Sequence, residues 1–141
     1  MKRILIYIIL SASFQPVIRG TSYEPVFFTD SIFDKRIKTI QLNREEWSLS
    51  YPLIRLNSSD RLAFHFDLLG DYPETYYYTI IHCDKDWQRS DLFTGDYLEG
   101  FSYDEISYYR PSFNTTVTYF HYRLIFPGER LKPLLSGNYI L

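Results

Sequence analysis

Residues 76–100 read YYYTIIHCDKDWQRSDLFTGDYLEG, and this stretch decides the fold class. It opens with aromatic and β-branched residues, which favour β-strands, and this pattern continues to about His82. It then passes through Cys83-Asp84-Lys85-Asp86, where turn-forming residues dominate, to Trp87 and a polar segment punctuated by glycine. The sequence therefore predicts a strand that ends near His82, a turn, and an ordered polar loop.

Two other stretches have the period-two alternation that is typical of a half-buried strand. In residues 61–68 (RLAFHFDL) one face carries Leu62, Phe64, Phe66 and Leu68. In residues 116–126 (TVTYFHYRLIF) the second face is also partly apolar, which predicts a central strand. Residues 37–42 (IKTIQL) are expected to form an edge strand. Residues 47–56 (WSLSYPLIRL) are expected to be extended, and residues 136–141 (SGNYIL) to begin a further strand.

These segments together predict an all-β fold, an antiparallel β-sandwich of the immunoglobulin or fibronectin type. No helical pattern of ten residues or more stands out after the first 20 residues. The chain has one cysteine, Cys83, so an internal disulfide is excluded. The pair of disulfide-bonded cysteines found in antibody domains is therefore absent. Because Cys83 follows a strand, we expect it to be a small core residue.

The first 20 residues have the features of a secretory signal peptide. Lys2 and Arg3 form a short positive region, residues 4–10 are apolar, and the small residues at 11–13 or Gly20 offer cleavage sites. The apolar run is shorter than the roughly 20 residues that span a bilayer. We therefore expect residues 1–20 to be removed on export, leaving residues 21–141 as a single domain outside the cytoplasm.

The charge balance argues against several classes of partner. The chain has 15 Lys and Arg residues and 17 Asp and Glu residues, so its net charge is −2. The net charge becomes −4 once Lys2 and Arg3 are lost with the leader. An acidic domain lacks the basic footprint that nucleic-acid binding needs. Attraction to anionic lipid is equally unsupported.

No catalytic, cofactor-binding or metal-binding residues are predicted. The histidines His65, His82 and His121 lie in separate predicted strands, and neither a zinc-binding nor a hydrolase motif occurs. Asp84 and Asp86 could begin a calcium loop, but the glycine and glutamate of an EF-hand are missing, so a turn is expected. Paired carboxylates such as Asp104 and Glu105 leave glycoside hydrolysis open in principle. The aromatic share of 19% leaves an exported carbohydrate-binding module as the alternative function.

Several blocks of the sequence resemble one family in the same order along the chain. The most distinctive are residues 51–56 (YPLIRL), His82-Cys83-Asp84 with Asp86-Trp87, residues 112–116 (SFNTT) and residues 136–139 (SGNY). They resemble the N-terminal β-domain of the plug protein of the Bacteroidetes type IX secretion system, over about residues 33–141. The aromatic strand followed by Asp84, Asp86 and Trp87 is also similar to a β-sandwich module of some sensor kinases, which implies the same fold class.

The resemblance to the plug family implies a non-enzymatic periplasmic protein without cofactors. Its implied partner is the outer-membrane β-barrel translocon, whose periplasmic mouth it would help to close. Family members run well past 141 residues, so the resemblance is to a first domain alone. From the residues themselves, the loop 87–101 sets aromatic side chains among polar ones. We therefore predict Trp87, Tyr97 and Phe101 as partner-binding residues, since Tyr and Trp are enriched at interface hot spots.

Overall fold

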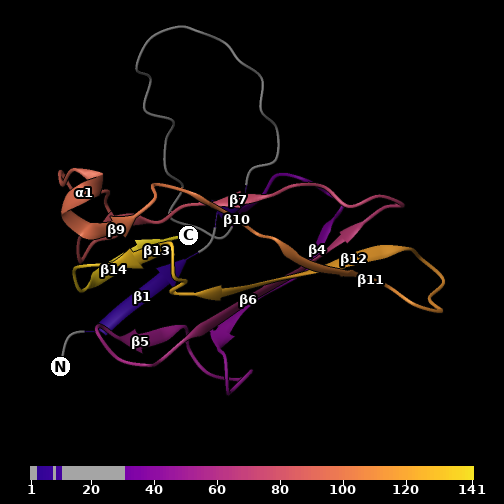
Figure 1. The fold of residues 1–141 in the computed structure, drawn as a ribbon, viewed down its shortest axis with the longest axis horizontal. Helices are drawn as coiled ribbons and strands as arrows, with labels where there is room; N and C mark the ends of the chain where they lie inside the picture. The colour runs from indigo at the N-terminus through magenta and orange to yellow at the C-terminus, as the bar shows by residue number, and fades with distance from the viewer. Residues whose placement is uncertain (1–2, 8, 11–30) are drawn as a thin grey trace, which may run out of the picture.

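The computed structural model describes residues 3–7, 9–10 and 31–141. Two four-stranded sheets form its framework (Figure 1). The first sheet consists, in spatial order, of β11 (Tyr108–Pro111), β12 (Tyr119–Phe126), β6 (Leu62–Leu69) and β4 (Ile37–Arg44). The second consists of β5 (Leu53–Arg55), β1 (Arg3–Tyr7), β14 (Gly137–Ile140) and β8 (Ile81–Cys83). The first sheet is antiparallel throughout, whereas in the second β1 runs parallel to β14 and antiparallel to β5.

Short paired segments complete the described part of the chain. β7 (Tyr77–Tyr78) pairs with β10 (Asp104–Glu105), and β9 (Leu98–Gly100) pairs with β13 (Leu131–Pro133), both antiparallel. β2 (Ile9–Leu10) pairs with β3 (Ser31–Ile32). A single-turn helix, α1 (Thr94–Tyr97), leads into β9. In Figure 1, α1 and the β11–β12 hairpin lie at opposite ends of the long axis of the molecule.

The core follows from the alternation of β6 and β12. These strands pair without interruption from Tyr119 opposite Leu69 to Phe126 opposite Leu62. The even-numbered side chains of both strands are buried, as the alternation predicts. They belong to the same core cluster as Ile54 and Tyr139 of the second sheet. The all-β antiparallel fold is therefore confirmed, with two sheets that share one core.

The position of the strands within the first sheet also agrees with the sequence. β12 lies between β11 and β6, and β4 lies at an edge. The ladder between β4 and β6 shifts register between Lys38 and Gln41, and Thr39 there adopts a positive φ of 55°. A bulge of this kind is common at sheet edges and explains the imperfect alternation of residues 37–42.

Residues 47–56 are not one extended stretch, so that prediction is wrong. Only Leu53–Arg55 form a strand. The preceding residues turn twice, because Trp47 N–H donates to the Arg44 carbonyl and Ser50 N–H donates to the Trp47 carbonyl. The Ser50 hydroxyl then accepts the backbone N–H of Arg44, which closes the turn against the end of β4. Local hydrogen bonds, including one to the Ser50 side chain, form a turn in place of the extended strand that the apolar residues suggested.

The remaining differences concern short segments. Residues 104–109 form β10 and the start of β11, with Ile106 buried between them. Residues 3–7 of the predicted signal peptide are paired in the second sheet as β1. Most of residues 1–30, including both predicted cleavage sites, lies outside the described residues. The signal peptide and its removal therefore stay predictions.

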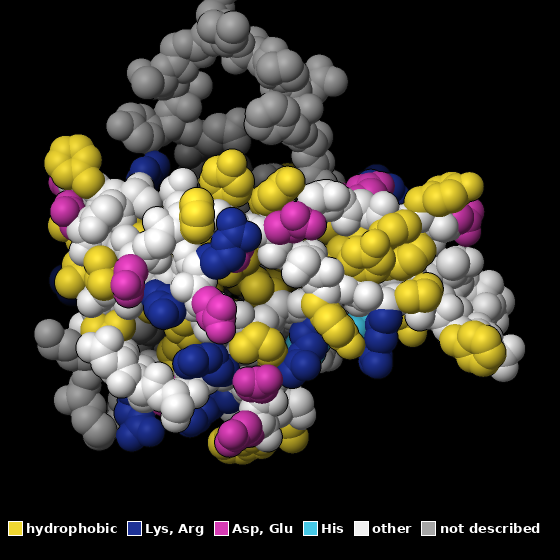
Figure 2. Space-filling view, viewed as in Figure 1, with side chains coloured by type: hydrophobic (Ala, Val, Ile, Leu, Met, Phe, Trp, Pro, Cys, Tyr) yellow, Lys and Arg dark blue, Asp and Glu magenta, His cyan; other side chains and the backbone are white. Residues whose placement is uncertain are grey.

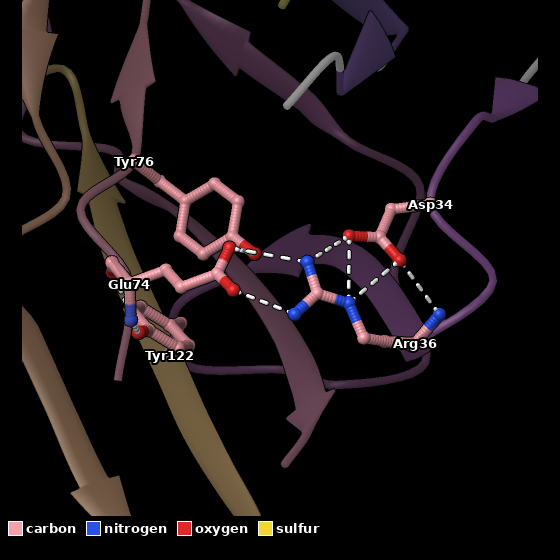
Figure 3. Close-up of polar contacts among 5 residues, drawn as sticks. All are labelled: Asp34, Arg36, Glu74, Tyr76 and Tyr122. Atoms are coloured by element: carbon pink, nitrogen blue, oxygen red, sulfur yellow. Dashed lines mark hydrogen bonds and ion pairs between the residues drawn. The ribbon is translucent and has the colours of Figure 1, made fainter. Parts of the chain in front are cut away.

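A cluster around the Tyr122 hydroxyl joins three distant segments (Figure 3). This hydroxyl accepts the backbone N–H of Glu74 at 2.8 Å and donates to the backbone carbonyl of the same residue at 2.7 Å. The Tyr122 ring stacks on Phe66 at a centroid distance of 4.7 Å, and Tyr76 meets both rings edge-on. On the outer side the Glu74 carboxylate binds Arg36, whose guanidinium also contacts Asp34.

We expect Tyr122→Phe to lower the free energy of unfolding by about 1–3 kcal/mol, because the half-buried N–H and carbonyl of Glu74 lose their partner. Urea unfolding followed by fluorescence measures this change. Tyr119→Phe, on the same strand but outside this bridge, is the control and should change stability by less than about 0.5 kcal/mol. Equal stability of Tyr122→Phe and wild type would show that water replaces the bridge.

Asp60 connects the two sheets through two arginines. Its Oδ1 lies 3.0 Å from Arg44 Nη2 at the end of β4, and its Oδ2 accepts the backbone N–H and Nε–H of Arg55 in β5. Its side chain is only 10% exposed. Hydrogen bonds from the side chain and backbone of Arg55 lower the pKa of the Asp60 carboxyl from 3.8 to about 2.

This pKa predicts a pH-dependent contribution to stability. Because the pKa is lower in the folded state, the ionised Asp60 stabilises the fold above about pH 4, and the contribution is lost as the pH falls toward 2. Asp60→Asn should therefore be less stable than wild type at pH 5–7, and the difference should shrink between pH 4 and pH 2. Thermal unfolding across this range tests it. A difference that does not depend on pH would contradict it.

Candidate functional site

Tyr77 and Tyr103 meet beside the β7–β10 pair, and Phe101 lies two residues before Tyr103. We call these three exposed aromatic side chains the aromatic ridge. Their exposed fractions are 58%, 57% and 62%. The rings of Tyr77 and Tyr103 meet edge-on at 5.8 Å between centroids. The backbone between them is held in place because the Thr79 hydroxyl donates to the Ser102 carbonyl at 2.6 Å. The ridge is therefore an ordered surface feature.

Arg130 is positioned at one end of the ridge. Its guanidinium carbon lies 4.6 Å from the centre of the Phe101 ring, and its Nη1 lies 3.2 Å from Asp104 Oδ1. The Phe101 N–H donates to the Arg130 carbonyl, which fixes the two backbones relative to each other. An arginine held between a ring and a carboxylate loses little conformational freedom when it binds a partner, so the ridge combines apolar contact area with an oriented cation.

The local sequence explains which tyrosines reach the surface. In the run of Tyr76, Tyr77 and Tyr78 the side chains alternate, so the first and third are buried and only Tyr77 is exposed. Gly100 has a φ of 98°, and a Cβ there would overlap the Arg130 carbonyl. The chain can therefore turn close to β13 only with glycine at this position, and the turn directs Phe101 outward.

The three predicted partner-binding residues occupy different environments. Phe101 is exposed and belongs to the ridge. Trp87 is half-buried in the turn after β8, with a positive φ of 63°. Tyr97 is only 4% exposed, and its hydroxyl donates to the Ile80 carbonyl at 3.4 Å. Tyr97 is thus a core residue in this structure, so its role in partner binding could only be indirect. Partner binding by these residues stays a prediction.

Tyr77 and Tyr103 are the ridge residues that sequence reasoning missed. The available signal was the alternation within residues 76–78, which exposes one tyrosine out of three. The pairing of β7 with β10, which brings Tyr103 beside Tyr77, is a long-range contact that no local pattern reveals. Other exposed apolar side chains lie in the β4–β5 loop (Trp47, Leu49 and Tyr51) and in the β11–β12 loop (Phe113 and Val117).

The turn after β8 is held together by Asp84. Asp84 Oδ1 accepts the N–H groups of Asp86 and Gln88, so this carboxylate stabilises the turn itself. Lys85 pairs with Asp86 at the surface. Cys83 is buried, as expected, and burial raises the pKa of its thiol to about 11. A thiol with such a pKa is a poor nucleophile near neutral pH.

A polar depression of about 340 Å³ lies on the outer face of the first sheet. It contains His65 and His121, whose rings stack at 5.4 Å, and His121 Nδ1 lies 2.7 Å from Asp67 Oδ1. Burial, and then the proximity of His121, lower the pKa of His65, whose Nδ1 is buried without a hydrogen-bond partner. His65 is therefore half-buried, although it lies on the polar face of its strand. Its half-buried position follows from the neighbouring strand β12.

In residues 3–7, 9–10 and 31–141 no three His, Cys, Asp or Glu side chains are placed to hold a metal ion. Within the same ranges, no helix has the length and apolar character needed to cross a membrane. Figure 2 shows apolar side chains in separate groups between charged ones across the visible face. The fold and surface define an all-β module with exposed aromatic side chains.

The comparisons with known proteins identify the family. The family model described as "Type 9 secretion system plug protein 1st domain" matches residues 37–141. A solved structure of a hypothetical protein from Parabacteroides merdae ATCC 43184 is similar, with a TM-score of 0.73 and 35% sequence identity. The match covers 75% of this chain and 27% of that chain, so the present chain spans about a quarter of that protein's length. No curated protein matches the chain.

The chain belongs to the type IX secretion system plug protein family, of which it contains the first domain. The resemblance seen in the sequence is thereby confirmed. Proteins of this family are components of a secretion system, and the family is not a known family of enzymes.

The different burial of Tyr97 and Phe101 predicts different effects of their loss. We expect Tyr97→Ala to lower the free energy of unfolding by about 3–5 kcal/mol, because it leaves a large cavity in the core. Phe101→Ala should change it by less than about 0.5 kcal/mol, as is usual at the surface. Chemical unfolding of both variants measures this. Similar stability losses in the two variants would contradict the assignment of Phe101 to the surface.

Proposed function

We propose that this chain is a non-enzymatic periplasmic component of the type IX secretion system that binds the outer-membrane translocon barrel and helps to close its periplasmic mouth. The match of residues 37–141 to the plug family carries this proposal. The predicted signal peptide supports a periplasmic location. In this view the chain needs no cofactor, and its contribution is a binding surface.

The aromatic ridge is the surface that we propose for contact with the barrel. Tyr and Arg are enriched at interface hot spots, and aromatic side chains supply contact area at a small cost in conformational entropy. Tyr77, Phe101 and Tyr103 are exposed, and Arg130 is already oriented beside them. The exposed Glu105 of β10 adds a negative charge to the rim of this surface, whereas the charge of Asp104 is paired with that of Arg130.

The carbohydrate-binding alternative gains little from this geometry. Stacking on a sugar needs an exposed flat ring face, and only Tyr77 of the tyrosine run is exposed. Its ring is almost perpendicular to that of Tyr103, at an interplanar angle of 83°, so the two rings do not form a shared platform. A glycan array with the same protein distinguishes the two functions, since a docking protein should bind no glycan saturably.

The test is a binding assay between the purified chain and the isolated translocon barrel. We expect the wild type to bind and the triple variant Tyr77→Ala/Phe101→Ala/Tyr103→Ala to bind at least tenfold more weakly, because hot-spot residues each contribute about 2 kcal/mol or more. The control is Leu49→Ala/Tyr51→Ala, which removes two still more exposed apolar side chains from the β4–β5 loop.

The possible results test the proposed contact surface and the proposed docking function separately. If the triple variant folds and binds like the wild type, the ridge is not the contact surface. If the control variant weakens binding instead, the β4–β5 loop is the contact. If the folded wild type does not bind the barrel at all, the docking proposal is wrong for this domain.

A further inference from the structure

The second sheet depends on a strand that lies outside the family domain. Its order is β5–β1–β14–β8, so β1 is the only connection between β5 and β14 in the described part of the chain. β1 pairs through Arg3, Ile4 and Leu5 with β5, and through residues 4–7 with β14. The family match begins at residue 37 and contains β5, β14 and β8 but not β1.

Residues 37–141 alone would therefore contain a gap one strand wide. Neighbouring strands lie about 4.8 Å apart, so β5 and β14 are separated by about 10 Å, which is too far for direct pairing. Without an occupant, the ladder groups of Leu53–Arg55 and of one edge of Gly137–Ile140 would lose their partners. Ile54, Tyr139 and Ile140 are almost fully buried in the present structure. An open gap beside such residues is unfavourable for both the backbone and the core.

The native occupant is not expected to be β1, since residues 3–7 lie in the predicted signal peptide. The family description itself names a first domain, and the similar Parabacteroides merdae protein has almost three quarters of its chain outside the match. That remaining part is a stretch of a relative's chain from which a further strand can come.

We propose that the gap between β5 and β14 is a strand-acceptor site, and that its occupant is an extended segment from the part of a plug protein outside the first domain. Residues 3–7 take the place of this segment in the present structure. The segment should be about four or five residues long, with an apolar side chain at every second position to cover the core, as in other cases of strand addition.

This inference does not depend on docking to the barrel, because it concerns how the domain completes its own sheet. It also specifies what the acceptor site requires. A Cβ at Gly137 would overlap the His82 imidazole on the neighbouring strand, so glycine keeps β14 close to β8 at the start of the site. His82 Nδ1 is held in turn by the Ser90 hydroxyl at 2.9 Å.

The test displaces β1 and supplies a replacement. The full chain carrying Leu5→Pro, made by cell-free synthesis so that residues 1–20 stay attached, loses a ladder N–H in the centre of β1. Leu5→Val, which keeps the N–H, is the matched control. Overlapping 15-residue peptides that cover the Parabacteroides merdae protein outside its matched region are then added, with the peptide KRILIYIIL (residues 2–10) as the positive control.

Hydrogen exchange measured by mass spectrometry is the readout. In Leu5→Pro we expect amides of residues 53–55 and 137–140 to exchange at least tenfold faster than in Leu5→Val, while the β6–β12 ladder remains protected. At least one of the Parabacteroides merdae peptides should restore slow exchange at both edges. If Leu5→Pro is unfolded, recovery of the β-sheet circular dichroism spectrum on adding a peptide is the equivalent result.

Three results would overturn the proposal. Slow exchange in monomeric Leu5→Pro without peptide would show that the gap closes internally. Slow exchange accompanied by dimer formation in light scattering would show that a second copy fills it. If KRILIYIIL restores protection but no Parabacteroides merdae peptide does, the site accepts a strand from a different source.

Discussion

The structure depends most on the pair of hydrogen bonds between the Tyr122 hydroxyl and the backbone of Glu74. Tyr122 lies on the central strand β12, and its ring is packed against Phe66 and Tyr76. By binding both the N–H and the carbonyl of Glu74, it fixes the chain two residues before the buried ring of Tyr76. Arg36 binds the same glutamate from the start of β4. A phenol that satisfies two backbone groups at the edge of the core thus aligns three segments far apart in sequence.

This alignment determines the surface next to it. Once Tyr76 is placed in the core, the alternation of the extended chain directs Tyr77 outward and Tyr78 inward. β10 then pairs with β7 and brings Tyr103 to the edge of the Tyr77 ring. Arg130 approaches from the other side, because Phe101 is hydrogen-bonded to its backbone. The aromatic ridge is therefore a consequence of core packing, and changes in the core would move it.

The two sheets differ in how completely the family domain supplies them. All four strands of the first sheet fall within residues 37–141, and β6 and β12 pair along their full length. The second sheet is joined in its centre by residues 3–7. Asp60, which binds Arg44 of one sheet and Arg55 of the other, holds β5 near the first sheet independently of β1. The first sheet is thus the self-sufficient part of the domain, and the second is the part open to an added strand.

The sequence by itself determined the fold class, the family and the buried faces of β6 and β12. These follow from local information, because a period-two pattern assigns every side chain of a long strand to one face, and the family blocks are linear motifs. Only the tertiary structure decided that Tyr97 is buried while Tyr77 and Tyr103 are exposed, and that His65 is stacked on His121. Tyr77 lies in a two-residue strand, Tyr97 in the single-turn helix α1 and Tyr103 outside any strand, so no long periodic pattern defines a face for them. Burial there depends on which distant segment covers the residue, and the same is true of the strand between β5 and β14.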